Sequence, residues 1–187
     1  MSIATFLEDR RAGFITRWHA RQTLRQETLA EHHYYVTHDA LVIADALWYY
    51  KIEKPVILTV LLLAHFHDAA EFESGDVSGR AKREYPELKA VSHKVDRHII
   101  EHVLFKNLPD DLAERYRSFA RQSCDAPETL EQQIVKYADK LEALYFAHTE
   151  VKVGNTLMAE VVTEVMKECR ALEWSWLVAL RKETGLP

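Results

Sequence analysis

The chain has 187 residues, of which 48% are hydrophobic and 28% charged, with only five glycines and five prolines. This composition is typical of a water-soluble globular protein and excludes an intrinsically disordered one. The length suits a single domain, residues 1–187, that buries its own core. A formal net charge of −5 argues against binding to a nucleic acid polymer, because phosphate backbones attract basic surfaces.

The charge is unevenly distributed along the chain. Residues 1–25 contain five arginines against Glu8 and Asp9, a net charge of +3, so the remainder carries −8. A small basic cluster on an acidic protein suits a compact anion such as a phosphate ester, although a solvated helix face is the other interpretation.

Cysteine content and hydrophobic runs indicate the cellular compartment. Cys124 and Cys169 form neither a disulfide framework nor a CxxC metal motif, so we expect a reducing environment. The N-terminus lacks the apolar region of a signal peptide, and the longest apolar run, residues 56–64, is about half of what a bilayer requires. We therefore predict a cytoplasmic protein with no membrane segment.

The first helical signals occur before residue 50. Ser2 is placed to cap a short helix that ends near Gly13. Thr28 and Glu31 form a T-x-x-E capping box, and apolar residues at helical spacing continue from there to about residue 50. A long helix is therefore predicted over this stretch.

Prolines mark the starts of the later helices. Pro55 suits the first turn of a helix that runs to about residue 72 and is apolar on nearly all sides, so we expect it to be central. Further helices are predicted from Pro86, from Pro109, from Pro127 to Gly154, and over about 156–182. No segment shows the period of two that a strand needs, so the predicted fold class is an all-α, single-domain helical bundle.

Two His-Asp pairs, His38-Asp39 and His67-Asp68, are candidates for chemistry. Ten histidines and ten aspartates in 187 residues produce about half of one such pair by chance, so the pair alone is weak evidence. His67-Asp68 differs because it ends the most apolar predicted helix and is followed by Glu71. One helical turn brings these three side chains toward one another.

Buried carboxylates need a counter-charge, which a divalent cation supplies. Two neighbouring ligands are too few, so the others must come from distant helices, and His32 and Asp139 are the candidates. Asp39 lies about 10 Å along the helix from His32, too far to share an ion with it. The spacing also permits a structural interpretation, in which Asp139 pairs with Lys136 or Arg117 and no metal binds.

Four motifs, in order and over about two thirds of the chain, resemble those of the HD-domain phosphohydrolases. They resemble in particular the 5′-deoxynucleotidase-like branch and the related phage dATP triphosphohydrolases. The motifs are RW at 17–18, E-x-x-x-E-H at 27–32, HDAAE-x4-D at 67–76 and K-x-x-D at 136–139.

This resemblance implies an HD-type fold that binds one divalent metal ion (Co²⁺, Zn²⁺, Mn²⁺ or Mg²⁺). The implied metal ligands are His32, His67, Asp68 and Asp139. Water on such an ion becomes more acidic, and the ion polarises a phosphoryl group.

The resemblance also assigns roles to the remaining motif residues. Glu71 would be the general acid/base, and Asp76 would orient the nucleophile or the leaving oxygen. Trp18 would pack on the sugar, and the cationic residues that hold phosphate oxygens would be Arg17, Lys82 and Lys136. The relatives form homo-oligomers, and we expect the same here.

The implied activity removes phosphate from 5′-deoxynucleotides, converting a dNMP to a deoxynucleoside and phosphate. One alternative is a triphosphohydrolase of the phage dATPase type, which converts dATP to deoxyadenosine and phosphates. Others are a non-catalytic HD nucleotide-binding scaffold, which the presence of Glu71 and Asp76 disfavours, and a helical interaction protein without metal.

The chain departs from the relatives in the region expected to meet the base and sugar. VSGRAKREY follows Asp76, where the relatives have a proline-containing stretch, and Ala20 replaces a larger residue. Base preference and phosphate number are therefore the least transferable properties. The added positive charge favours a longer phosphate chain.

Overall fold

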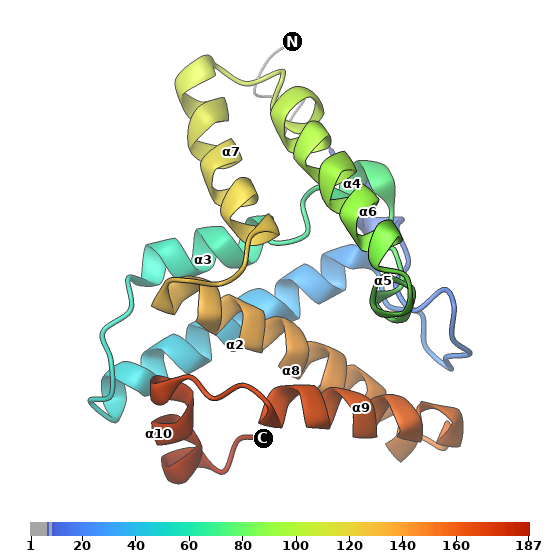
Figure 1. Cartoon of the computed structure of the whole chain (residues 1–187), viewed down its shortest axis with the longest axis vertical. Helices are drawn as coiled ribbons and strands as arrows, with labels where there is room; N and C mark the ends of the chain where they lie inside the picture. The colour runs from blue at the N-terminus through green and yellow to red at the C-terminus, as the bar shows by residue number, and fades with distance from the viewer. Residues whose placement is uncertain (1–6, 8) are drawn as a thin grey trace.

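The computed structural model describes residue 7 and residues 9–187 (Figure 1). The α-helices in this part of the chain are α2 (Leu29–Tyr49), α3 (Ile57–Phe66), α4 (Glu71–Ser74), α5 (Gly79–Glu84), α6 (Pro86–Ile99), α7 (Asp110–Cys124), α8 (Leu130–Lys152), α9 (Ala159–Arg170) and α10 (Ser175–Thr184). A π-helical turn, Ile100–Leu104, continues α6.

The prediction of an all-α fold is confirmed. Over residue 7 and residues 9–187 the structure has no strand, and an isolated antiparallel bridge joins Thr16 to Thr28. None of the helices in this part of the chain is long and apolar enough to cross a membrane. The helix predicted from Ser2 begins outside the described residues; a 3-10 turn, Arg11–Gly13, ends at the predicted glycine.

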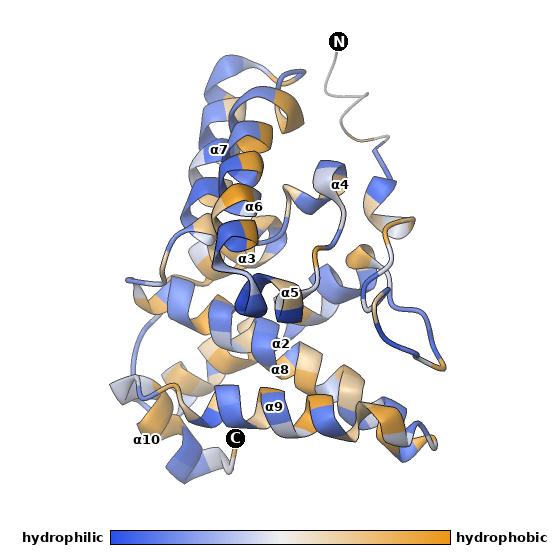
Figure 2. Ribbon diagram, turned by 45° about the vertical axis from the view of Figure 1, so that its right-hand side comes forward, coloured by the Kyte–Doolittle hydropathy of each residue, from blue (hydrophilic) through white to orange (hydrophobic). Residues whose placement is uncertain are grey.

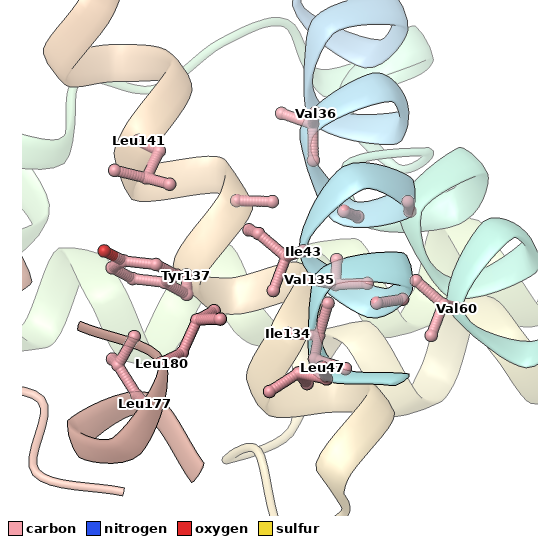
Figure 3. Packing of buried hydrophobic residues seen from close by; sticks show 14 of the residues in the cluster. Val36, Ile43, Leu47, Val60, Ile134, Val135, Tyr137, Leu141, Leu177 and Leu180 are labelled. Carbon is pink, nitrogen blue, oxygen red and sulfur yellow. The ribbon is translucent and has the colours of Figure 1, made fainter. Parts of the chain in front are cut away.

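The centre of the molecule is the contact between α2 and α8, on which α3, α9 and α10 pack (Figure 1). Figure 3 shows the side chains that fill it, each no more than 6% exposed: Val36, Ile43, Leu47, Val60, Ile134, Val135, Tyr137, Leu141, Leu177 and Leu180. Full burial of an aliphatic side chain contributes about 1.5–3 kcal/mol. The core therefore fixes α2 and α8 relative to each other, and these helices carry His32 and Asp139.

A second apolar cluster joins the end of α3 to α6 and α7, which project together from the α2–α8 layer (Figure 1). Phe66 contributes to it, with its ring 5.7 Å from that of Phe105. Phe66 immediately precedes His67, so this cluster anchors the segment that carries the His67-Asp68 pair.

The helix predicted from Pro55 to residue 72 is wrong in its extent. α3 begins at Ile57 and ends at Phe66, and four turn residues separate it from α4. In the turn the backbone bonds tighten: Ala69 N donates to Phe66 O and Glu71 N to Asp68 O, each three residues back. His67 and Asp68 therefore lie in a turn rather than at the end of a continuous helix.

The single helix predicted over 156–182 is also wrong, because α9 and α10 are separate. The Arg181 guanidinium donates to the carbonyls of Cys169 (2.5 Å) and Leu172 (2.7 Å). The Cys169 carbonyl, in the last turn of α9, also accepts from Leu172 N at 3.1 Å, so the guanidinium adds to the bonds at this helix end and ties it to α10. Periodicity alone did not reveal this side-chain cap, which is formed by a residue of the following helix.

The remaining boundaries are close to those predicted. α2 starts with the predicted capping box of Thr28 and Glu31. α6 has Pro86 in its first turn and α7 follows Pro109, as expected. α8 begins at Leu130 rather than Pro127, because a second capping box, formed by Thr129 and Gln132, starts it.

The capping box of α2 supports the first turn, in which His32 lies. In Thr28→Ala, the hydroxyl that accepts from Glu31 N at 3.2 Å is lost, which we expect to cost about 1 kcal/mol of unfolding free energy. Urea denaturation measures this loss. Thr149→Ala, an exposed site on α8, is the control and should change stability by less than about 0.5 kcal/mol; equal effects would contradict the prediction.

Candidate active site

The four predicted metal ligands converge in space. His32 comes from the first turn of α2, His67 and Asp68 from the turn after α3, and Asp139 from α8. One nitrogen or oxygen of each lies within 4.8 Å of those of the other three. The competing pair, His38-Asp39, is outside this group, and the His38 side chain is 57% exposed.

The two imidazoles are oriented as metal ligands would be. His67 Nδ1 lies 2.8 Å from the carbonyl of Ala64, and His32 Nδ1 lies 2.7 Å from Glu142 Oε2. Because both acceptors require a proton on Nδ1, the neutral form of each imidazole, which is the form that binds a metal, carries its lone pair on Nε2. The two Nε2 atoms lie 3.0 Å apart, close enough for one cation to contact both.

Two carboxylates complete the group. Asp68 Oδ2 lies 3.2 Å from His67 Nε2, and Asp139 Oδ1 lies 3.6 Å from His32 Nε2. Burial raises the pKa of Asp68, but the histidines outweigh burial and hold this pKa well below its usual range. Both the donor set and its charge suit a divalent cation.

Asp139 also forms the ion pair that the structural interpretation expected, with Lys136 Nζ 2.7 Å from its Oδ2. Burial raises the pKa of Asp139, but the charges of Lys136, His32 and His67 together outweigh burial and lower it. Because Oδ1 still faces His32, the ion pair and metal ligation are compatible. Arg117, the other suggested partner, pairs with Glu114 at 3.5 Å.

Glu71 lies beside the ligand group and is 8% exposed. Burial, and then the charges of Asp68 and Asp76, raise the pKa of Glu71 to about 9. Lys82 Nζ is 3.8 Å from Oε1, while Oε2 has no hydrogen-bond partner among the described residues. Glu71 is therefore a carboxyl that holds its proton at neutral pH and has an oxygen free to act on a ligand.

Arg17 and Trp18 lie on the loop before α2, which the bridge between Thr16 and Thr28 ties to the start of that helix. Arg17 Nη1 is 3.4 Å from Asp68 Oδ2. Trp18 has a φ of 60°, an uncommon conformation for a non-glycine residue. Its indole stacks on Phe146, with ring centroids 5.4 Å apart, so surrounding contacts hold this conformation.

One cavity of about 310 Å³ connects these residues. All the predicted site residues except His32 and His67 line this cavity. They are Arg17, Trp18, Asp68, Glu71, Asp76, Lys82, Lys136 and Asp139. A second cavity of about 520 Å³ lies along α6 and shares Asp68, Glu71, Lys82 and Lys136 with the first. The ligand group thus stands between two cavities, both of which have cationic walls.

The strongest positive charge on these walls comes from α5, one of the most hydrophilic segments in Figure 2. Its residues Arg80, Lys82 and Arg83 line the first cavity. Arg83 is also paired with Glu168 of α9 at 3.3 Å. Residues of α5 and of α9 therefore both line the first cavity.

Sequence reasoning missed Glu142 and gave no role to Glu27, and both are buried behind His32. Glu142 is 4% exposed and Glu27 only 1%. A signal for Glu142 was present, because it follows Asp139 by three residues and therefore shares its face of α8. Glu27 stands in the E-x-x-x-E-H motif, but its neighbours come from distant parts of the chain.

Solved structures with the same fold include two phosphohydrolases. An HD-domain phosphohydrolase of Listeria innocua aligns with a TM-score of 0.75 at 21% identity, covering 98% of this chain and 87% of that one. The HD phosphohydrolase DatZ of cyanophage S-2L, bound to dA and one catalytic Zn²⁺ ion, aligns with a TM-score of 0.66 at 22% identity, covering 98% and 94%. These likenesses establish the HD-type fold.

Sequence comparison identifies the family. A 5′-deoxynucleotidase of Pectobacterium atrosepticum is 29% identical over 148 residues, covering 78% of this chain and 71% of the relative. A 5′-deoxynucleotidase of Vibrio cholerae is 28% identical over 148 residues, covering 78% and 73%. The family model described as 5′-deoxynucleotidase YfbR-like matches residues 6–180. This chain therefore belongs to the YfbR-like 5′-deoxynucleotidase family.

Proposed function

We propose that this protein is a divalent-metal-dependent phosphohydrolase that converts 5′-deoxynucleoside monophosphates to deoxynucleosides and phosphate. The observation that carries the proposal is the convergence of His32, His67, Asp68 and Asp139 beside a proton-bearing Glu71 on one cationic cavity. Membership of a family whose relatives are named 5′-deoxynucleotidases supports the substrate class.

The four ligands would hold one divalent cation, which would supply Lewis-acid polarisation of the phosphoryl group and acidify the attacking water. We propose that this ion is Co²⁺, Zn²⁺, Mn²⁺ or Mg²⁺. Nitrogen and carboxylate ligands in equal number are compatible with several transition metals.

The cationic residues would bind the phosphate of the substrate. The side chains of Arg17, Lys82 and Lys136 all reach the cavity, and none has all its donors used within the described structure. Positive groups placed around a phosphoryl centre offset the charge that develops on its oxygens. Trp18 lines the same wall and is proposed to contact the sugar.

Glu71 would act as the general acid. When water attacks phosphorus and the bond to the 5′-oxygen breaks, the leaving deoxynucleoside oxygen needs a proton. A pKa raised to about 9 keeps that proton on Glu71 at neutral pH. Asp76, also on the cavity wall, is proposed to orient the nucleophile or the leaving oxygen.

A dNTP triphosphohydrolase is the second candidate function. The larger cavity favours it, because that cavity extends from the shared Lys82 and Lys136 to Lys89 and His93 on α6. These positive or ionisable groups would suit a longer phosphate chain. The arginines and lysine of α5 add to the same charge.

Assembly into a homo-oligomer remains a prediction. On α6, Val91 and Val95 lie about one turn apart and are 56% and 43% exposed. An apolar helix face of this kind is suited to a subunit contact.

Metal binding is expected to stabilise the folded protein. At a free Co²⁺ concentration 100 times the Kd, the gain is about 2.7 kcal/mol, or about 5–10 °C in Tm. Thermal unfolding of the metal-free protein with and without Co²⁺ measures it. His67→Ala should abolish the shift, whereas His38→Ala, in the exposed His-Asp pair, should retain it. If His67→Ala keeps the Co²⁺-induced rise in Tm, His67 is not a metal ligand.

Replacement of Glu71 by Gln removes the acidic proton while preserving shape. We expect kcat to fall by about 10²–10⁴, while Co²⁺ still binds with one equivalent per chain. Steady-state kinetics and metal analysis of the same preparation measure both. A kcat close to that of the wild-type protein would mean that another residue acts as the general acid/base.

The decisive test of function is a product-resolved panel of dNMPs, dNTPs and ribonucleotides with each of the four metals. We expect phosphate release from dNMPs, a lower kcat/KM for ribonucleotides, and loss of activity with a chelator that added metal reverses. Efficient conversion of dNTPs to deoxynucleosides would favour the second candidate instead. Activity that is indifferent to the chelator would contradict the metal mechanism.

A further inference from the structure

Two buried glutamates, Glu27 and Glu142, lie directly behind the metal-ligand group. They have no assigned role in the proposed reaction and do not line the cavity that holds the other site residues. Burial of a carboxyl group is costly unless hydrogen bonds or opposite charges compensate for the lost hydration. Their contacts therefore identify what they support.

Glu142 supports a metal ligand that another helix supplies. Its Oε2 lies 2.7 Å from His32 Nδ1, and the His32 side chain is fully buried. Glu142 follows Asp139 by three residues on α8, so one face of α8 provides both a ligand and the hydrogen-bond acceptor for the ligand of α2. A carboxylate that accepts the second N–H of a ligating imidazole fixes its tautomer and raises its basicity.

Glu27 supports the substrate-binding loop instead. The Trp18 indole N–H donates to Glu27 Oε2 at 2.8 Å, and Arg17 Nε lies 3.6 Å from the same oxygen. The backbone takes part too, because Arg17 N donates to Glu27 O at 2.9 Å. Together these contacts hold Trp18 at its positive φ and aim both side chains at the cavity.

The two carboxyl groups adjoin each other. Glu27, His32 and Glu142 each place one potential ligand atom within 4.8 Å of the other two. A single buried acidic pair thus contacts the metal-binding helix on one side and the arginine–tryptophan loop on the other.

We propose that Glu142 is a positioning residue for the metal ligand His32, and that Glu27 is a positioning residue for Arg17 and Trp18. The inference rests on the proposed function, since it assigns the supports of that same site. It predicts that the two glutamates have separable effects: loss of Glu142 weakens metal binding, and loss of Glu27 weakens substrate binding.

The same three residues have a second chemical interpretation, in which they bind a metal ion of their own. That ion would take the place of the proton between His32 Nδ1 and Glu142. The separation of 2.7 Å is that of a charge-assisted hydrogen bond, which favours the positioning role. Metal stoichiometry separates the two: one Co²⁺ per chain supports positioning, and two Co²⁺ per chain, with one lost in Glu142→Gln, would overturn it.

The first arm of the experiment measures Co²⁺ affinity by competition with a chelator, together with the visible spectrum of bound Co²⁺, without nucleotide. Glu142→Gln should weaken binding by about 10- to 100-fold and change the spectrum, because the imidazole loses an anionic acceptor. Glu142→Asp keeps the charge and should recover part of the affinity. Glu142→Asp also tests the role of Glu142 if Glu142→Gln does not fold.

The matched control is Glu150→Gln, which changes another buried glutamate of α8 that is 2% exposed. Glu150 accepts from the backbone of Leu24 and Arg25 and is remote from the ligand group. Its replacement should leave Co²⁺ affinity and spectrum unchanged. Equal Co²⁺ affinities for Glu142→Gln and wild type, or equal losses for Glu142→Gln and Glu150→Gln, would overturn the role of Glu142.

The second arm measures KM and kcat for a dNMP. Glu27→Leu leaves the Trp18 N–H without an acceptor and should raise KM roughly tenfold or more, with a smaller effect on kcat and on Co²⁺ affinity. Glu27→Gln keeps an acceptor of the same shape and should restore KM toward wild type. An unchanged KM in Glu27→Leu would overturn its role. Since the Co²⁺ arm requires no turnover, failure of the proposed hydrolysis remains distinguishable from failure of this inference.

Discussion

The burial of several carboxyl groups where α2, α8 and the turn after α3 meet is the constraint on which the site depends. Asp68, Glu71, Asp139, Glu142 and Glu27 lie close together, and the cationic side chains beside them are those of Arg17, Lys82 and Lys136. Such a group is unstable unless protons, cationic side chains or a metal ion neutralise it. At this site the protons on some of the acids, the cationic side chains and the proposed metal ion provide that neutralisation.

Protonation divides the acids into two kinds. Burial and the nearby Glu142 raise the pKa of Glu27 to about 8, and burial with the charges of Asp68 and Asp76 raises that of Glu71 to about 9. Asp68 and Asp139 have histidine or lysine partners that keep their pKa values low. The ionised acids thus include Asp68 and Asp139, which face the imidazole Nε2 atoms, and Glu142, which faces His32 Nδ1. Burial raises the pKa of Glu142, but His32, Glu27 and Arg17 together outweigh burial and lower it.

The apolar core explains why this charged group keeps its geometry. Packing of α2 on α8 sets where His32 stands relative to Asp139, and the cluster around Phe66 holds the turn that carries His67 and Asp68. Close-packed interiors resist small displacements. The polar site is therefore built on two rigid apolar supports, and α5 adds a cationic wall to its cavity.

Interactions between near neighbours in the chain were predictable from the sequence: the capping box at Thr28, the helical periods, and the motif that contains His67 and Asp68. They depend on contacts three or four residues apart. The break after Phe66, the cap formed by Arg181 and the bond from His32 to Glu142 were not. His32 and Glu142 are 110 residues apart, and packing between helices, which no local pattern encodes, brings them together.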